Sequence, residues 1–142
     1  KIDPDSTERA YDDIINIAYK NNIDGLIISN TSTERTSNLS SRFFSESGGL
    51  SGKPLRDKSN EVLKLVAAKT KGEISLIGVG GISNAKDVYQ KIKLGASAVQ
   101  LYTALTFEGS KLIENIKRDL VKFLKQDNFE NIEQAVRSEI KN

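Results

Sequence analysis

The chain has 142 residues, of which 28% are charged and 37% hydrophobic, and its formal net charge at pH 7 is +2. This length suits a single domain over residues 1–142, and the balanced charge gives no electrostatic reason to expect a nucleic-acid partner. Cys and His are both absent, which excludes zinc sites, disulfides, thiol nucleophiles and Ser-His-Asp triads, and we expect no metal. The chain starts at Lys1 and contains no Met, so we expect it to be a piece of a longer polypeptide.

The first third of the sequence predicts a helix, a strand and a long loop. Asp5 can cap a helix that ends near residues 21–22, because Tyr11, Ile14, Ile15 and Ala18 fall on one face. The short apolar run 25–28 is typical of a strand covered on both faces. Residues 30–58 are rich in Ser, Thr, Asn and Gly and have no sustained period, which indicates a functional or a disordered loop.

The middle of the sequence repeats the helix–strand order twice. Ser59 can cap a helix whose apolar positions run from Val62 to Ala67, and a buried strand follows at residues 74–79. Ser83 can cap a second helix that Gly95 ends, and residues 98–102 predict a third strand.

The last third of the sequence is helical. A short segment at 104–107 precedes the longest helix, which begins near Ser110, and a final helix starts near Asn131. The inner side of the long helix is expected to carry Leu112, Ile113, Ile116, Leu120, Phe123 and Leu124. Alternating strands and helices favour an α/β fold with parallel strands.

The run Gly78-Val79-Gly80-Gly81 lies where a strand enters a helix, and this invites a dinucleotide-binding interpretation. That fingerprint needs a third glycine, where Ser83 stands, and an acidic residue about 20 positions further on, where the chain reads Gln-Leu-Tyr-Thr at 100–103. The pattern therefore favours a (β/α)8 TIM barrel over a doubly wound sheet.

Barrels of this type commonly bind phosphate with the loops after strands 7 and 8 and a short extra helix. Gly80 and Gly81 let an anion approach the backbone, and Thr103 adds a hydroxyl at a helix start. The same glycines would also serve a tight turn alone. Three strands, with the end of a fourth at Lys1-Ile2, predict the C-terminal half of a barrel, since a whole one needs eight strands and about 250 residues.

Six short runs then occur in order along the chain. They are Lys1-Ile2-Asp3-Pro4-Asp5, Asn22-Ile23-Asp24-Gly25, Ser29-Asn30-Thr31, Gly48-Gly49-Leu50-Ser51-Gly52-Lys53-Pro54-Leu55, Gly78-Val79-Gly80-Gly81-Ile82 and Gly95-Ala96-Ser97. Together they resemble the dihydroorotate dehydrogenase family, and Gly-Gly-Leu-Ser-Gly followed by Lys-Pro-Leu resembles its quinone-dependent class 2. The similarity spans nearly all of this chain but only the later half of the family's chain.

The resemblance implies a set of FMN-binding and substrate-binding residues. The FMN-binding residues are Lys1, Ser29, Gly52, Gly80, Gly81, Tyr102 and Thr103, and the substrate-binding residues are Asn30 and Thr31. Lys1 would stabilise negative charge on the flavin pyrimidine ring, although a solvated terminal lysine is the plain alternative. The amide of Asn30 can donate to and accept from a dihydropyrimidine, but an Asx turn would equally explain it.

The resemblance also implies an activity: oxidation of dihydroorotate to orotate, with reduction of FMN and then of a quinone, in de novo pyrimidine (UMP) biosynthesis. The family's serine base and its membrane-docking helices belong to segments outside this chain, so we nominate no catalytic residue here. The implied location is a peripheral one, on the cytoplasmic face of the bacterial inner membrane or on the mitochondrial inner membrane.

Two alternatives remain open at this point. Another phosphate-binding TIM-barrel oxidoreductase would share Gly80 and Gly81 but would not explain residues 29–31 and 48–55. The second alternative is a non-catalytic half-barrel, which would self-associate because an open half exposes sheet edges and an apolar face.

Overall fold

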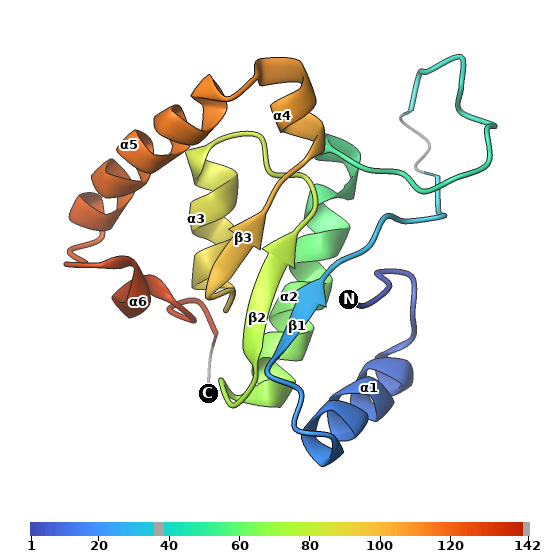
Figure 1. The fold of residues 1–142 in the computed structure, drawn as a ribbon, viewed down its shortest axis with the longest axis horizontal. Helices are drawn as coiled ribbons and strands as arrows, with labels where there is room; N and C mark the ends of the chain where they lie inside the picture. The colour runs from blue at the N-terminus through green and yellow to red at the C-terminus, as the bar shows by residue number, and fades with distance from the viewer. Residues whose placement is uncertain (36–38, 141–142) are drawn as a thin grey trace.

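The computed structural model describes residues 1–35 and 39–140, and its centre is a parallel sheet of three strands. The strands are β1 (Gly25–Ile28), β2 (Ser75–Val79) and β3 (Ala98–Gln100), in the spatial order β1-β2-β3. β1 pairs with β2 from Gly25 opposite Ser75 onward, and β2 pairs with β3 through Val79 opposite Gln100. All three strands therefore end at the same edge of the sheet (Figure 1).

A further segment lies beside β1, where the sequence predicted the end of a fourth strand. Ile2 forms an isolated parallel bridge with Ile28. The Ile2 N–H donates to the Ile27 carbonyl at 2.9 Å, and the Asn30 N–H donates to the Ile2 carbonyl at 2.8 Å. This bridge brings Lys1 to the carboxyl edge of the sheet. The peptide bond between Ile28 and Ser29 is cis.

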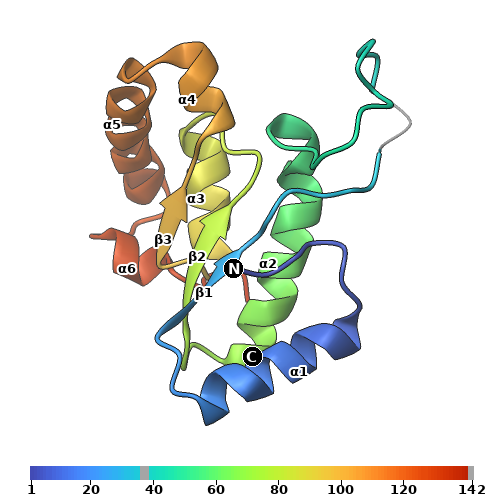
Figure 2. The same cartoon turned by 45° about the vertical axis from the view of Figure 1, so that its right-hand side comes forward.

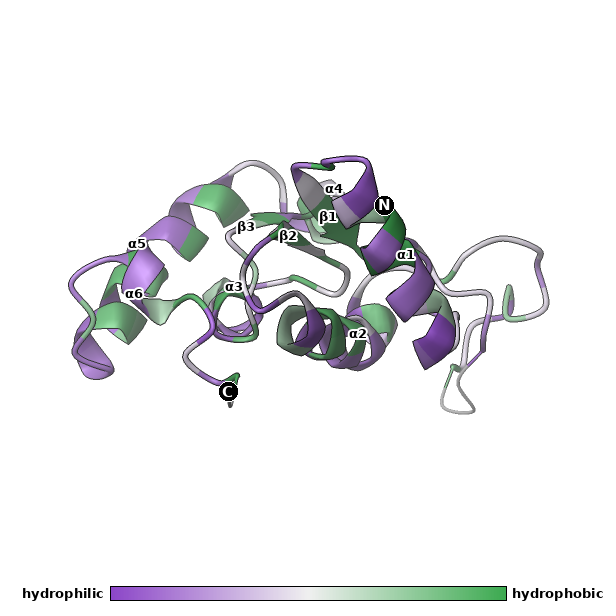
Figure 3. Cartoon of the chain, turned by 90° about the horizontal axis from the view of Figure 1, so that it is seen from below, coloured by the Kyte–Doolittle hydropathy of each residue, from purple (hydrophilic) through white to green (hydrophobic). Residues whose placement is uncertain are grey.

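Helices cover one face of the sheet. In chain order they are α1 (Glu8–Lys20), the 3-10 helix η1 (Lys53–Leu55), α2 (Arg56–Thr70), α3 (Ala85–Lys93), α4 (Thr103–Glu108), α5 (Lys111–Gln126) and α6 (Ile132–Ala135). Figure 3 shows α2 and α3 together beneath the strands. Leu26, Ile28 and Leu76 point to that side and are buried, whereas Ile27 and Ile77 on the other side are only half-buried. The expectation that strand 25–28 is covered on both faces is therefore wrong within the described residues.

Three helices start at residues other than those that the sequence predicted. Thr7, not Asp5, caps α1 by accepting from the Ala10 N–H, and Asn84, not Ser83, caps α3 by accepting from the Asp87 N–H. α2 begins at Arg56 directly after η1, so Ser59 lies inside the helix and is fully buried.

Two further elements are shorter than expected. β3 ends at Gln100 instead of residue 102, and the last helix, which starts next to the expected Asn131, ends at Ala135. The expected stop at Gly95 is confirmed, since α3 ends at Lys93 and Gly95 adopts a φ of 111°.

The core lies between the sheet and the helices α2 and α3, with α5 packed on the outer side of α3. The rings of Tyr89 and Phe123 stack there with their centroids 5.5 Å apart. Leu112 and Ile116 of α5 are buried against this layer as predicted, but Ile113 is 39% exposed, which corrects the prediction that it faces inward.

Substitution of two adjacent α5 residues tests this orientation. Leu112→Ala should lower the free energy of unfolding by about 2 kcal/mol or more, because it empties a buried site. Ile113→Ala should change it by less than about 1 kcal/mol, because that side chain is largely solvated. Urea unfolding followed by circular dichroism measures both. Equal losses for the two variants would contradict the described packing of α5.

Candidate functional site

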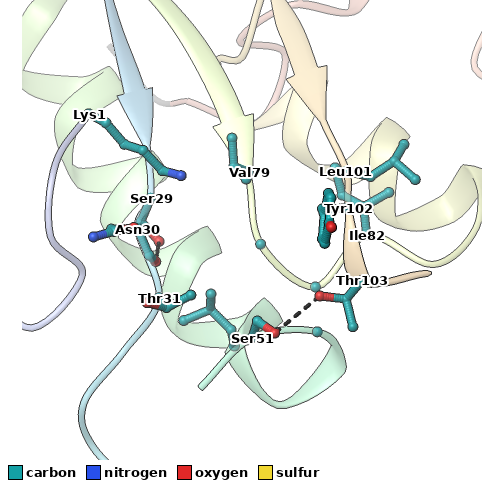
Figure 4. Close-up of a pocket in the computed structure, with 14 residues that line it drawn as sticks. Lys1, Ser29, Asn30, Thr31, Ser51, Val79, Ile82, Leu101, Tyr102 and Thr103 are labelled. Carbon is teal, nitrogen blue, oxygen red and sulfur yellow. Dashed lines mark hydrogen bonds between the residues drawn. The ribbon is translucent and has the colours of Figure 1, made fainter. Parts of the chain in front are cut away.

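A cavity of about 290 Å³ opens at the carboxyl edge of the sheet (Figure 4). All nine residues that the sequence assigned to FMN or substrate line this cavity, although they come from five separate segments of the chain. They are Lys1, Ser29, Asn30, Thr31, Gly52, Gly80, Gly81, Tyr102 and Thr103. The parallel register explains the convergence, because it brings the ends of β1, β2 and β3 together.

The carbonyl of Val79, the last residue of β2, connects the strand ends. It accepts the Ser29 N–H at 3.1 Å and the Ser59 hydroxyl at 2.6 Å. Ser29 is only 1% exposed, and its hydroxyl donates to the Asn30 carbonyl at 2.9 Å. The start of the segment after β1 is thus fixed to β2 and, through Ser59, to α2.

The double-glycine turn follows immediately after Val79. Gly80 and Gly81 have φ values of 107° and 74°, which favour glycine. A Cβ on Gly81 would overlap Arg56 at the start of α2, and one on Gly80 would lie 3.0 Å from Ser59 Cβ. Turn geometry and helix packing therefore both require these glycines. Within residues 1–35 and 39–140, the N–H groups of Gly80 and Gly81 also donate no hydrogen bond to another protein group.

The opposite side of the cavity is formed by the return of the long loop toward β3. Gly52 has a φ of 72°, and a Cβ there would lie 3.1 Å from Thr103 Cγ2. The Thr103 hydroxyl donates to Ser51 Oγ at 3.1 Å (Figure 4). Two hydroxyls and the backbone of Gly52 thus face the double-glycine turn across the cavity. α4, which starts at Thr103, has only six residues, so the hydroxyl matters more here than the helix dipole.

The two ends of the long loop between β1 and α2 are hydrogen-bonded to each other near the cavity. Ser32 and Leu50 exchange backbone hydrogen bonds of 3.2 and 2.6 Å. The Thr31 side chain occupies the place that a Cβ on Gly49 would need. Figure 2 shows the rest of the loop extending beyond the strand ends, and residues 36–38 within it lie outside the described part of the chain.

Asp5 anchors the start of this loop. Its carboxylate accepts from the Ser32 hydroxyl at 2.7 Å and from the Thr33 N–H at 2.7 Å, and it pairs with Lys58 Nζ at 2.6 Å. Burial raises the pKa of Asp5, but hydrogen bonds from Lys58, Ser32 and Thr33 together hold that pKa well below its usual value. Asp5 therefore acts as a loop anchor and does not cap α1.

The polar side chains that face the cavity differ in how firmly they are held. Lys1 is exposed, and its side chain extends into the cavity mouth beside Ser29 (Figure 4). The side-chain amide of Asn30 makes no hydrogen bond within the described residues, so the Asx turn considered from the sequence is absent there. Tyr102 is 82% exposed, so its ring has little packing to fix it.

Sequence reasoning did not single out five other lining residues, which are Ser51, Leu55, Val79, Ile82 and Leu101. Ser51 directly precedes Gly52 in the quoted run, so its position was a usable signal. The apolar four looked like ordinary core residues. Within the described residues, no group of three acidic residues could hold a metal ion.

The sequence of the chain is similar to those of known proteins. The family model described as "Dihydroorotate dehydrogenase" matches residues 1–124. The chain belongs to the dihydroorotate dehydrogenase family. It is 47% identical over 136 residues to the mitochondrial dihydroorotate dehydrogenase (quinone) of Mus musculus, covering 96% of this chain and 34% of the relative. It is 43% identical over 136 residues to the quinone enzyme of Rhodospirillum rubrum, covering 96% and 37%.

Solved structures agree with this family assignment. A crystal structure of dihydroorotate dehydrogenase from Eimeria tenella in complex with ferulenol superposes with a TM-score of 0.95 at 34% identity. The match covers 99% of this chain and 38% of that chain, so the chain spans little more than a third of these relatives. The dihydroorotate dehydrogenase family is flavin-dependent. No helix among the described residues is long and apolar enough to cross a bilayer.

Asp5→Asn tests the loop anchor. A carboxyl whose pKa is lowered on folding contributes stability that is complete above its unfolded pKa of about 3.9 and is lost as the pH falls through its folded pKa. The variant should therefore lose about 1–3 kcal/mol of stability at pH 7 and less in acid, and its Thr33 amide should exchange hydrogen faster.

The control for the loop anchor is Asp24→Asn, which removes an exposed carboxylate elsewhere on the surface. It should leave both stability and Thr33 exchange near those of the parent chain. Unchanged Thr33 exchange in Asp5→Asn, measured by NMR at pH 7, would show that the carboxylate does not hold the loop.

Proposed function

We propose that this chain is the C-terminal half of a (β/α)8 barrel in a quinone-dependent dihydroorotate dehydrogenase, which oxidises dihydroorotate to orotate in pyrimidine biosynthesis. Family membership and the similarity to quinone-dependent relatives support the activity. The three parallel strands, the bridge at Ile2 and the glycine turn near the end of the sheet support the later half of a barrel. The half-covered face of the sheet would then be the barrel interior, which preceding units would complete.

The observation that carries the proposal is the arrangement of unpaired donors around the cavity. The N–H groups of Gly52, Gly80 and Gly81 make no hydrogen bond to the described protein, and the Ser51 and Thr103 hydroxyls line the same cavity. Buried or half-buried N–H groups normally find a partner, and a phosphate oxygen provides one. The residues present therefore fit the phosphate of FMN.

The rest of the cavity fits the flavin ring and a dihydropyrimidine. Lys1 supplies a positive charge at the mouth of the cavity, beside the expected position of the flavin pyrimidine ring. Ser29 lines the same part of the cavity. The side-chain amide of Asn30, with Thr31 beside it, can donate to and accept from the substrate's carbonyl and N–H groups. Bound FMN would supply the redox chemistry, and these side chains would position the reactants.

The cellular location and the other parts of the enzyme belong to the same proposal. The proton acceptor, the membrane-docking helices and the quinone channel would lie in segments other than this one. The protein would then be peripheral to a bacterial inner membrane, on its cytoplasmic face, or to the mitochondrial inner membrane; the relatives above include a mitochondrial and a bacterial enzyme.

The direct assay measures dihydroorotate-dependent bleaching of a quinone-coupled dye by the intact protein. We expect turnover with dihydroorotate and FMN. Absence of turnover with dihydroorotate, together with turnover of a different substrate on the same FMN, would contradict the proposed substrate and favour another barrel oxidoreductase.

Asn30→Ala tests the substrate contact in the same assay. The KM for dihydroorotate should rise about tenfold or more, because hydrogen bonds worth about 1.5 kcal/mol are lost, while FMN binding stays unchanged. Asn115→Ala is the matched control, because that asparagine lies on α5, outside the cavity lining, and accepts a hydrogen bond from Arg118 at 3.0 Å. A KM that responds equally to both substitutions would remove Asn30 from the substrate site.

A further inference from the structure

Lys91 of α3 is a lysine with no solvent exposure, which is rare because an ammonium loses its hydration on burial. Its Nζ donates to Ser59 Oγ at 2.5 Å and to Asn60 Oδ1 at 2.8 Å, both in α2. The side chain reaches them by crossing β2 at Gly78, where a Cβ would lie 2.9 Å from Lys91 Cδ. A glycine in the middle of the sheet thus makes room for a buried cation.

Two consecutive hydrogen bonds connect Lys91 to the cavity. Ser59 accepts from Lys91 and donates its own hydroxyl to the Val79 carbonyl at 2.6 Å. Ser59 Oγ also lies 3.0 Å from the position that a Cβ on Gly80 would take. Lys91 and Ser59 therefore form a layer directly behind the double-glycine turn.

The charged groups that face Lys91 come from its own helix and from α2. Asp87 attracts the ammonium, and Arg56, which pairs with Asp87 at 3.5 Å, repels it. No charged side chain of β2 or β3 faces it in the described part of the chain. Arg56 also pairs with the exposed Asp57 at 2.9 Å, so two carboxylates neutralise it, and Lys91 is the cation that lies directly behind Ser59 and the turn.

Holding this cation is unfavourable for the fold itself. Burial lowers the pKa of Lys91 to about 8, against the opposing attraction of Asp87. Apolar residues of similar volume usually replace buried charges with little loss of stability. A charge kept at such a position, behind a turn whose Gly80 and Gly81 N–H groups have no partner among the described residues, indicates a role in holding an anion.

We infer that Lys91 is a positioning residue for the phosphate site: it fixes the Val79–Gly81 turn through Ser59, and its charge favours a phosphate over an uncharged group at that turn. This inference rests on the proposed FMN site. It concerns the phosphate alone and leaves the flavin ring and the substrate to the residues described above.

The experiment compares FMN with riboflavin, because the two ligands differ only in the phosphate. Dissociation constants for both are measured by flavin fluorescence with the intact apoprotein at pH 7. In Lys91→Met, FMN should bind about tenfold more weakly, while riboflavin should bind within about twofold of the parent value. Lys86→Met, which removes an exposed lysine from the same helix, should leave both constants unchanged.

The outcomes separate three accounts of Lys91. Equal weakening of FMN and riboflavin in Lys91→Met would mean that Lys91 is only structural and would overturn the inference, as would no change in either. A parent protein that does not prefer FMN to riboflavin would instead refute the proposed phosphate site, and the inference with it.

A pH series on the unsubstituted protein decides the matter if Lys91→Met does not fold. Between pH 7 and 9.5 the phosphate stays dianionic, since its second pKa is about 6, while the Lys91 ammonium loses its proton. The preference for FMN over riboflavin should therefore fall severalfold across this range, and in a folded Lys91→Met protein it should stay flat. A constant preference in the parent protein would overturn the inference.

Discussion

The parallel register of β1, β2 and β3 is the constraint on which the site depends. Because the strands run in the same direction, the residues that follow them emerge at one edge, where Ser29, Gly80 and Tyr102 line a single cavity. The Val79 carbonyl then fixes the relative positions of two of these ends, since it accepts from Ser29 and from Ser59. Loss of this register would scatter the site residues, which are far apart in the sequence.

A second layer, made by α2 and α3, supports the cavity from behind. The first turns of α2 contribute Arg56 and Ser59, which pack against Gly81 and Gly80, and α3 contributes Lys91. Within the described residues, the buried polar side-chain atoms of this layer are hydrogen-bonded, whereas the N–H groups of Gly52, Gly80 and Gly81 on the cavity side are not. This difference indicates that α2 and α3 hold the double-glycine turn rigid from behind, and that the cavity side of the turn binds the ligand.

Strong local patterns predicted the strands, and tertiary contacts decided what the sequence left ambiguous. The apolar run Gly25–Ile28 is a strand with those bounds, because four consecutive apolar residues between polar segments leave few alternatives. Ser59 and Ser83 resembled helix caps, but η1 begins the α2 helix earlier and Asn84 caps α3. Ile113 resembled a core residue because its helix is amphipathic, and only the packing of α5 on α3 shows that it is exposed.

The residues that line the cavity could be predicted from the sequence, whereas the residues that hold them in place could not. Motif positions brought nine residues to one cavity, yet periodicity could not mark Lys91, since a lysine within an amphipathic helix normally faces water. Asp5 was likewise assigned a helix cap, although its carboxylate holds Ser32 and Thr33, because partners 27 and 28 residues away leave no local signal. Contacts of this kind become visible only when the fold places distant residues side by side.

The claim that this edge of the sheet holds a phosphate is tested most directly by ¹H–¹⁵N NMR during titration with FMN. The amide resonances of Gly52, Gly80, Gly81 and Thr103 should shift downfield together as their N–H groups acquire an acceptor, and riboflavin should not reproduce these shifts. Unchanged resonances at these four positions, while other amides respond to FMN, would contradict the account.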